Sequence, residues 1–350
     1  MSERYAVIAG ATGIVGTRLA QCLHASGWEV MGLCRHPPAP AVPYRTMGVD
    51  LTDARDCREK LGALRSATHV FYTARYDHPE GQTESVDVNA AMLANLLEPI
   101  QRVAPGLRHV HLVHGTKYYG HMLGPLQVPI SEDAPRARVP NFYFAQEDFL
   151  RDRQRGRSWT YTIARPHTFC DGDPTEPRNA ALLIAMHATL ARALGEPLTY
   201  PGSDRSFNAR TQFTFVPMLA RAIEWMATDA RCANEAFNIV NGDTPRWAEL
   251  WPQFAAYFGV QPGPPVQMRL ADDLVRKEAV WQTLVKRHDL VSVPLSARVL
   301  WPYADYLFAP EWDIISSAAK ARAYGFGERV DSAKMFEALF ESFRRERIIP

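Results

Sequence analysis

A glycine-rich segment near the N-terminus limits the possible folds more than any other feature of the sequence. The apolar run 5–9 leads directly into Gly10-Ala-Thr-Gly-Ile-Val-Gly16, and residues 14–25 then carry apolar side chains at helical spacing. Glycines allow a tight turn between a strand and a helix, and they let backbone N–H groups approach a pyrophosphate at the positive end of that helix. The segment therefore predicts a dinucleotide-binding turn. Five of its residues are expected to contact the cofactor: Gly10, Thr12, Gly13, Ile14 and Gly16.

The N-terminal half alternates short apolar runs with amphipathic segments. Further strands are predicted at 28–34, 45–49, 69–72, 108–114 and 159–164, with helices at 53–65, 85–97 and 144–155 between them. Strands that alternate with helices favour a parallel sheet with right-handed crossovers. We expect Pro99 to bend or end the helix that begins at Ser85, because proline lacks the backbone N–H that a helix interior needs.

The pattern becomes mostly helical after Pro166. Helices are predicted at 178–194, 217–229, 246–258 and 333–346, and one strand at 236–240 is expected to return to the sheet. We therefore predict an α/β fold with a Rossmann-type, doubly wound parallel sheet and a smaller, mostly helical region that covers the substrate. Residues 1–166 and the strand near 235–242 would form the nucleotide-binding domain, and 167–234 with 243–350 the covering region.

Composition excludes several classes of protein. The formal net charge of +1 gives no reason to expect nucleic-acid binding. The five cysteines are scattered without metal-ligand spacing, which fits a reducing compartment, and His109 and His111 share a strand face without an acid or cysteine to complete a metal site. No run of 18 apolar residues predicts a membrane span. We expect a cytoplasmic protein without a bound metal.

The residues after the second and third strands bear on which nucleotide is bound. An NAD-binding chain usually places an acid after the second strand for the ribose hydroxyls, whereas this chain has Arg35 and His36 there. The planar guanidinium of Arg35 suits a 2′-phosphate, and this favours NADP(H) as the nucleotide. The alternative is that Arg35 is a solvated loop residue without a role in binding. Asp50 and Leu51 follow the third strand, where the Asp50 carboxylate could either meet the adenine amino group or simply form a turn.

The usual Tyr-x-x-x-Lys pair of short-chain reductases is absent. None of the 13 tyrosines has lysine four residues later, and Tyr143 has Glu147 at that position. Only six of the 39 basic residues are lysines, and the other 33 are arginines. A lysine in this chain therefore suggests a position where arginine would not serve. Lys117 follows the fifth strand, whose carboxyl end is expected to face the nicotinamide. Such a lysine could bind the ribose and perturb a nearby phenol, or it could simply be exposed to solvent.

The sequence resembles the progesterone 5β-reductase/iridoid synthase-like (PRISE) family, an atypical group of extended short-chain dehydrogenase/reductases. The resemblance spans most of the chain. It rests on the glycine turn and the Arg35 region, and on these further segments: 68–72, 89–93, 114–120, 141–148, 165–166, 234–243 and 348–350. The family's Thr-Gly-x-Lys-x-Tyr motif places its lysine at Lys117, and its Asn-Phe-Tyr-Tyr-x-x-Glu-Asp motif places its catalytic tyrosine at Tyr143. This chain departs from the motifs at His114, Phe144 and His36.

The resemblance implies an NADPH-dependent reductase that acts on the C=C bond of enones and enals. A hydride would add to the β-carbon, and Tyr143, polarised by Lys117, would stabilise the enolate oxygen. Pro166 is expected to let backbone approach the nicotinamide, although it could simply end its strand. The expected partner is a small molecule, and a homodimer is a further expectation from the family. Five phenylalanines are either an apolar substrate pocket or part of the core: Phe144, Phe169, Phe207, Phe213 and Phe215.

Two other classes stay open on the sequence alone. One is a carbonyl reductase or sugar-nucleotide epimerase of the extended short-chain group, against which the missing Tyr-x-x-x-Lys pair argues. The other is a non-catalytic NADP(H) sensor, which would bind the nucleotide without consuming it. Candidates for both the tyrosine and the lysine are present, and this favours an enzyme.

Overall fold

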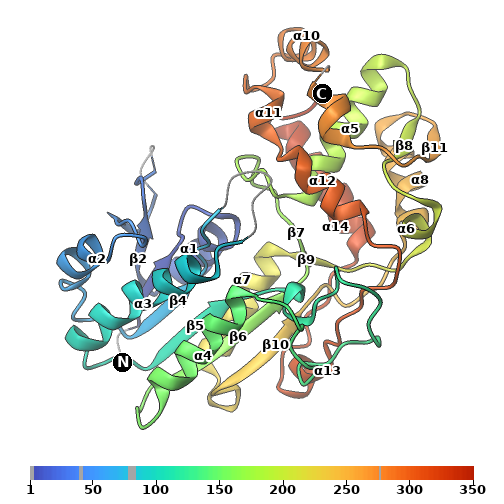
Figure 1. Ribbon diagram of the computed structural model, residues 1–350. Coiled ribbons are helices and arrows are strands. Elements are labelled where there is room, and N and C mark those ends of the chain that lie inside the picture. Colours follow the sequence, from blue (N-terminus) through green and yellow to red (C-terminus); the bar gives the residue numbers. More distant parts are fainter. Residues whose placement is uncertain (1–3, 39–41, 78–83, 276) are drawn as a thin grey trace.

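A parallel sheet forms the centre of one of two lobes (Figure 1). The computed structural model describes residues 4–38, 42–77, 84–275 and 277–350. Within them, the sheet has seven strands in the order β10-β6-β5-β4-β1-β2-β3. Their bounds are β1 Tyr5–Ala9, β2 Glu29–Cys34, β3 Arg45–Gly48, β4 His69–Tyr72, β5 His109–Val113, β6 Thr160–Pro166 and β10 Glu235–Ile239. The strand order reverses between β1 and β4, which is where such sheets bind their ligands.

Helices cover both faces of the sheet. Alternate side chains of a strand point to opposite faces, so Val7 packs under one helical layer and Ile8 under the other. The layer over Val7 contains α2 Ala54–Leu61, α3 Val86–Val103 and α4 Phe142–Gln154. The layer over Ile8 contains α1 Ile14–Ala25 and α7 Val216–Thr228, together with α13 Ala319–Ala323. The sheet is therefore buried on both sides, as its apolar strands require.

The second lobe is a helical cap. Its core helix is α5 Ala180–Leu194, which is buried on all sides from Ala180 to Ala191. Aromatic side chains pack around it, among them Trp251, Phe254 and Phe336. The other cap helices are α6 Asp204–Asn208, α8 Trp247–Phe258, α9 Leu270–Val275, α10 Glu278–His288, α11 Leu295–Arg298, α12 Trp301–Phe308 and α14 Ser332–Arg345. Short strand pairs complete the lobe and its junction with the sheet: β7 Thr168–Cys170 with β9 Phe213–Phe215, and β8 Leu198–Tyr200 with β11 Pro262–Pro265.

Two parts of the predicted covering region belong to the sheet lobe instead. α7 lies within 167–234 and α13 within 243–350, yet both pack against the sheet. α7 has a strongly apolar face with Val216, Leu219 and Ile223 buried against α1 and the strands. That face needs the sheet to cover it, and so the chain passes between the lobes more often than the predicted boundaries imply.

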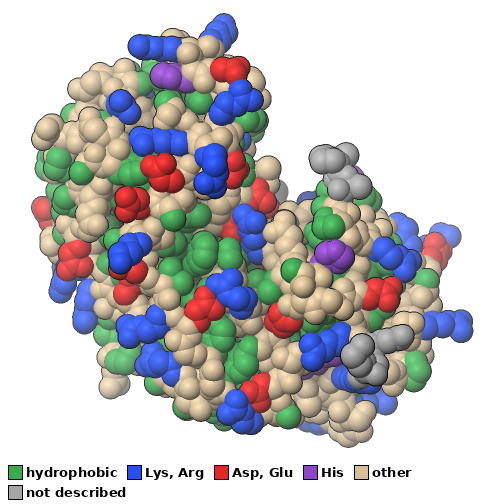
Figure 2. Space-filling view, turned by 180° about the vertical axis from the view of Figure 1, so that it is seen from behind, with side chains coloured by type: hydrophobic (Ala, Val, Ile, Leu, Met, Phe, Trp, Pro, Cys, Tyr) green, Lys and Arg blue, Asp and Glu red, His purple; other side chains and the backbone are tan. Residues whose placement is uncertain are grey.

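The strands and long helices predicted from the sequence occur within a few residues of their expected positions, with one clear difference. α3 does not end at Pro99 but continues to Val103, because the buried proline contributes packing that offsets the missing hydrogen bond. Of the helices in the described part of the chain, none is both long and apolar enough to cross a membrane. Figure 2 shows basic and acidic side chains interspersed over the back of the molecule.

Candidate active site

The glycine turn after β1 has little room for side chains. Gly10 has φ +81°, and a Cβ built there would lie 2.9 Å from the Ala74 backbone. A Cβ on Gly16 would lie 2.0 Å from the Gly10 carbonyl oxygen. Gly13 caps α1 without a side-chain hydrogen bond. The N-terminal, positive end of α1 therefore lies beside the point where the strand order reverses. Its backbone N–H groups are close to the surface, which is the arrangement that a pyrophosphate needs.

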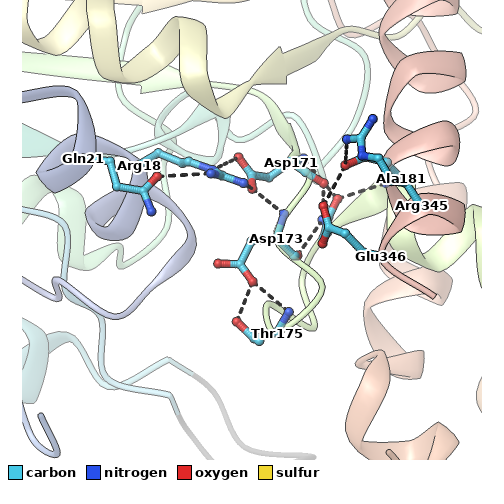
Figure 3. A network of polar contacts seen from close by, with 10 residues as sticks. Arg18, Gln21, Asp171, Asp173, Thr175, Ala181, Arg345 and Glu346 are labelled. Carbon is cyan, nitrogen blue, oxygen red and sulfur yellow. Dashed lines mark hydrogen bonds and ion pairs between the residues drawn. The ribbon is translucent and has the colours of Figure 1, made fainter. Parts of the chain in front are cut away.

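A loop from the cap lies against this end of α1. Arg18 of α1 and Asp171 form an ion pair with an N–O distance of 2.7 Å, and Asp171 is fully buried (Figure 3). Farther along the loop, the carboxyl group of Glu176 meets the backbone N–H of Ile14. Burial, assisted by the nearby Asp173, raises the pKa of Glu176 to about 7. An acidic group thus already occupies the neighbourhood of the expected phosphate site.

Residues expected at the adenine end occupy positions that fit a nucleotide only in part. Arg35 is exposed after β2, and Leu51 is buried. The Asp50 carboxylate accepts hydrogen bonds from the Thr52 backbone N–H and hydroxyl at 2.9 and 2.7 Å, which lower its pKa. Asp50 therefore forms a turn, and its contact with adenine stays a prediction, as does that of Arg35 with a 2′-phosphate.

A cleft lies between the sheet lobe and the cap, lined in part by His121, His167 and Tyr306. Its reaction end begins at the carboxyl end of β5. Gly115 leads into a single turn of 3₁₀ helix, η1 Thr116–Tyr119, which carries Lys117. Asn141 connects this turn to α4: its side-chain oxygen accepts from the Tyr143 backbone N–H at 3.0 Å, and its amide donates to the Lys117 carbonyl at 3.1 Å. This N-cap places Tyr143 in the first turn of α4 and fixes it relative to Lys117.

Tyr143 is partly buried between two strand ends. Its ring stacks on His114 with centroids 4.5 Å apart. A Cβ built on Gly115 would be 3.4 Å from the Tyr143 hydroxyl and 3.5 Å from the Pro166 carbonyl oxygen, so the two predicted site residues Tyr143 and Pro166 lie close together beside Gly115. Burial raises the pKa of Tyr143 to about 12, with Arg75 lowering it and Glu84 raising it by smaller amounts. The phenol is therefore protonated at neutral pH and can donate a hydrogen bond.

Lys117 lies at the same edge but is turned to other partners. Its ammonium is 2.8 Å from the Glu84 carboxylate and 5.2 Å from the centre of the Tyr306 ring. Among the described residues, no hydrogen bond joins Lys117 to Tyr143. The structure brings the two predicted residues to one site, and any influence of Lys117 on the phenol acts in this state through space.

The position four residues after Tyr143 serves another purpose in this chain. Glu147 is fully buried and forms ion pairs with Arg151 at 2.6 Å and with the buried Arg165 at 3.6 Å. The Arg165 guanidinium lies 3.5 Å from the centre of the Tyr118 ring, and it donates to the Tyr119 hydroxyl at 3.2 Å. Glu147 and Arg165 thereby hold η1 against β6. The position that is lysine in a Tyr-x-x-x-Lys pair is therefore Glu147 in this chain, and it supports the turn that carries Lys117.

Three residues of this site were missed by sequence reasoning: Arg75, Glu84 and Tyr306. Arg75 follows β4, and the rule that strand ends face the ligand would have found it if applied to that strand. Glu84 precedes α3, and Tyr306 comes from α12 of the cap. No spacing or motif in the sequence signals that these two meet Lys117.

The five phenylalanines do not form a pocket together. Phe213 is fully buried against Trp247 and Phe336, and so it belongs to the cap core. Phe144 packs on Tyr118, and Phe207 on Tyr200. Phe215 is partly buried against the cores of both lobes, and Phe169 against the core of the sheet lobe. A shallow hollow opens beside Tyr306 instead, and residues of other types line it, including His121, His167, Trp247 and Trp312.

The strand histidines are tied to threonines. Both ring nitrogens of His109 are within 2.9 Å of the Thr160 and Thr162 hydroxyls, and His111 is 2.8 Å from the Thr162 hydroxyl. Burial lowers the pKa of His109, His111 and His114, so that all three are neutral. Over the described ranges, no group of three metal-ligating side chains comes together.

The parallel sheet, its order reversal and the glycine turn define a Rossmann-type dinucleotide-binding fold. Solved structures share it at low sequence identity. A UDP-glucose 4-epimerase of Thermotoga maritima has a TM-score of 0.69 at 16% identity, covering 97% of this chain and 99% of that one. The UDP-glucose 4-epimerase of Thermus thermophilus, solved with NAD, has a TM-score of 0.68 at 16% identity, with the same coverage.

Sequence comparison identifies the family within this fold. Residues 48–350 match the family described as PRISE-like Rossmann-fold domain. A 3-oxo-Δ(4,5)-steroid 5β-reductase of Arabidopsis thaliana is 32% identical, covering 99% of this chain and 94% of that protein. An (S)-8-oxocitronellyl enol synthase of Catharanthus roseus is 31% identical, covering 99% and 92%. The chain belongs to the PRISE-like Rossmann-fold family, and it is an oxidoreductase.

Proposed function

We propose that this chain reduces the C=C bond of α,β-unsaturated ketones and aldehydes with NADPH. The observation that carries the proposal is the protonated Tyr143 hydroxyl, partly buried beside Gly115 and Pro166, with Lys117 on the adjoining turn. The names of the two relatives support the substrate class, since one is a steroid 5β-reductase and the other an enol synthase.

The residues of the cleft fit a nicotinamide dinucleotide phosphate. The glycine turn and the N-terminus of α1 would hold the pyrophosphate, and the exposed Arg35 would pair with the 2′-phosphate. Lys117 and Pro166 would lie at the nicotinamide end, at the carboxyl ends of β5 and β6. When bound, the reduced cofactor supplies the hydride that the β-carbon of the substrate receives.

Tyr143 would act on the substrate oxygen. As negative charge develops on the carbonyl oxygen, the phenol donates a hydrogen bond to it from a fixed position in a partly buried site. The Lys117 ammonium adds a favourable field along the same edge of the sheet. The α-carbon would take its proton from solvent. Because the phenol has a pKa near 12, Tyr143 stays a donor throughout the neutral pH range.

The test is a turnover assay with a panel of small enones and enals. The purified protein is mixed with NADPH and 2-cyclohexen-1-one or a linear monoterpene enal, nicotinamide absorbance is followed, and products are identified by mass and NMR. We expect saturated ketones or aldehydes. Tyr143→Phe should lower kcat by about 100-fold or more while the Kd for NADPH stays within a factor of two.

Other products or outcomes would redirect the proposal. An allylic alcohol would mean carbonyl reduction. Tight NADPH binding without any consumption across the panel would favour a sensor. Full activity in Tyr143→Phe, with NADPH still bound, would remove Tyr143 from the reaction.

A further inference from the structure

A row of alternating charges lies at the reaction end of the cleft. It runs from Lys117 to Glu84, Arg75, Asp77 and Arg178. The Lys117 ammonium and the Arg75 guanidinium each approach the same carboxylate oxygen of Glu84, Oε1, at 2.8 Å. Arg75 is 3.7 Å from Asp77, whose other oxygen is 2.9 Å from Arg178. Glu84 is thus the member of the row that joins two cations.

Glu84 and Tyr306 hold Lys117 from two sides. The ammonium lies 5.2 Å from the centre of the Tyr306 ring, and the Tyr306 hydroxyl is 3.2 Å from the His121 ring. A lysine ammonium is carried on a flexible four-carbon chain, so without such partners it would sample many positions. The Glu84 side chain is only 22% exposed, which strengthens its hold on the two cations relative to a surface ion pair.

The same carboxylate limits the charge that Tyr143 faces. Arg75 and Glu84 act on the phenol in opposite directions. His114, stacked on its ring, is neutral. With Glu84 between Arg75 and Lys117, both cations near the Tyr143 hydroxyl have a negative partner. Without the Glu84 carboxylate, the Lys117 side chain would adopt several conformations, and the charges of Lys117 and Arg75 would repel each other.

We propose that Glu84 is a positioning residue that holds the Lys117 ammonium in place for the reaction. This inference rests on the proposed function, because it gives Lys117 a part in turnover. Glu84 acts through Lys117 and needs no contact with the substrate. Its contribution therefore belongs to kcat, and it disappears when the lysine is absent.

The experiment compares Glu84→Gln in two backgrounds, wild type and Lys117→Met. In the wild-type background we expect kcat for 2-cyclohexen-1-one to fall by about tenfold, since a neutral amide binds an ammonium more weakly than a carboxylate does. KM and the Kd for NADPH should stay within a factor of two. In the Lys117→Met background, Glu84→Gln should lower kcat by no more than a further factor of two. Glu84→Asp, which keeps the charge, should recover part of the loss.

A readout without cofactor or substrate tests the same contact. Acetic anhydride in limited amount is added to the nucleotide-free protein, and acetylation of Lys117 is quantified by peptide mass spectrometry. Release of the ammonium from Glu84 should speed this acetylation several-fold in Glu84→Gln. The matched control is Glu98→Gln on α3, whose carboxylate pairs with Arg153. The control should change neither kcat nor the labelling of Lys117.

The outcomes separate this inference from the proposed function. An active wild type with unchanged kcat in Glu84→Gln would overturn the inference alone. So would an equal loss in both backgrounds, because a merely structural glutamate lowers activity whether or not the lysine is present. A wild type that reduces no member of the enone panel would overturn the proposed function, and the positioning role with it.

Discussion

The two ends of the cleft are built by different means. At the nucleotide end, backbone atoms do the work: Gly10 and Gly16 leave space, and the first turn of α1 presents N–H groups. At the reaction end, side chains from separate elements surround Lys117 and Tyr143, and most of them carry charge or hydrogen-bond to one another. The first end is fixed as soon as β1 and α1 pack. The second depends on a balance among charges that come from distant parts of the chain.

This difference predicts how each end fails. A change at the backbone end should disturb the packing of the turn and the binding of the nucleotide together. A change at the side-chain end should act through charge, and its size should follow how deeply the affected charges are buried. Three substitutions test this contrast, and the first should have the largest effect.

Arg165→Met tests the buried part of the reaction end. It removes a guanidinium that is 2% exposed and leaves the fully buried Glu147 with fewer cations around it. We expect the free energy of unfolding to fall by about 3 kcal/mol, measured by denaturant titration. The matched control is Arg151→Met, which removes the half-exposed partner of the same carboxylate and should cost less than about 1 kcal/mol. Equal losses in the two variants would contradict the role of burial.

Gly16→Ala tests the backbone end. The added methyl group would lie 2.0 Å from the Gly10 carbonyl oxygen, so the turn must shift. We expect a loss of about 1–3 kcal/mol in unfolding free energy, together with weaker NADPH binding in a fluorescence titration. Gly106→Ala is the control, because a methyl group there would meet no atom within 4 Å. If Gly16→Ala bound NADPH as tightly as wild type, close packing of this turn would not be needed for the nucleotide.

Glu176→Gln tests whether charge matters at the backbone end as well. The pKa of Glu176 is raised to about 7, so the group is neutral below that pH and negative above it. A negative charge near the N-terminus of α1 opposes a bound pyrophosphate. The Kd for NADPH of wild type should therefore rise relative to that of the variant, by about 2- to 5-fold, as pH increases from 6 to 8.

The comparison with the variant cancels the titration of the cofactor's own phosphate, which occurs in both proteins. Glu59→Gln, on the exposed surface of α2, serves as the control and should match wild type at each pH. A constant ratio between wild type and Glu176→Gln across this range would show that the carboxyl group does not oppose the phosphates.

The sheet lobe could be predicted largely from the sequence, because its signals are local. Each strand is a short apolar run next to an amphipathic helix, and the glycine turn identifies where the first pair begins. α7 was assigned to the wrong lobe since its apolar face does not say which surface it will cover. The helix predicted over 85–97, which Pro99 was expected to bend or end, continues through Pro99 to Val103, because the packing of a buried ring is a tertiary effect that the sequence does not show.

The candidate site was predictable only where residues follow strand ends or match a family motif. Tyr143 and Pro166 lie on either side of Gly115, and Lys117 is on the adjoining turn with its ammonium on Glu84; their roles stay predictions. Glu84 and Tyr306 reach the same place from a helix start and from the cap, and their arrival depends on the docking of whole elements. The charge balance that these residues create is a property of the folded chain, which no local pattern carries.

The place of β10 in the chain affects how the protein can be synthesised. β10 covers the edge of β6, yet residues 235–239 follow β6 by about seventy positions, most of which form cap segments. During translation the first six strands can assemble while β6 still exposes unpaired backbone N–H and C=O groups. Such an edge is a template for pairing with another chain until its own partner arrives. Conditions that slow the ribosome between residues 166 and 235 therefore favour aggregation of the nascent chain, even when the finished protein is stable.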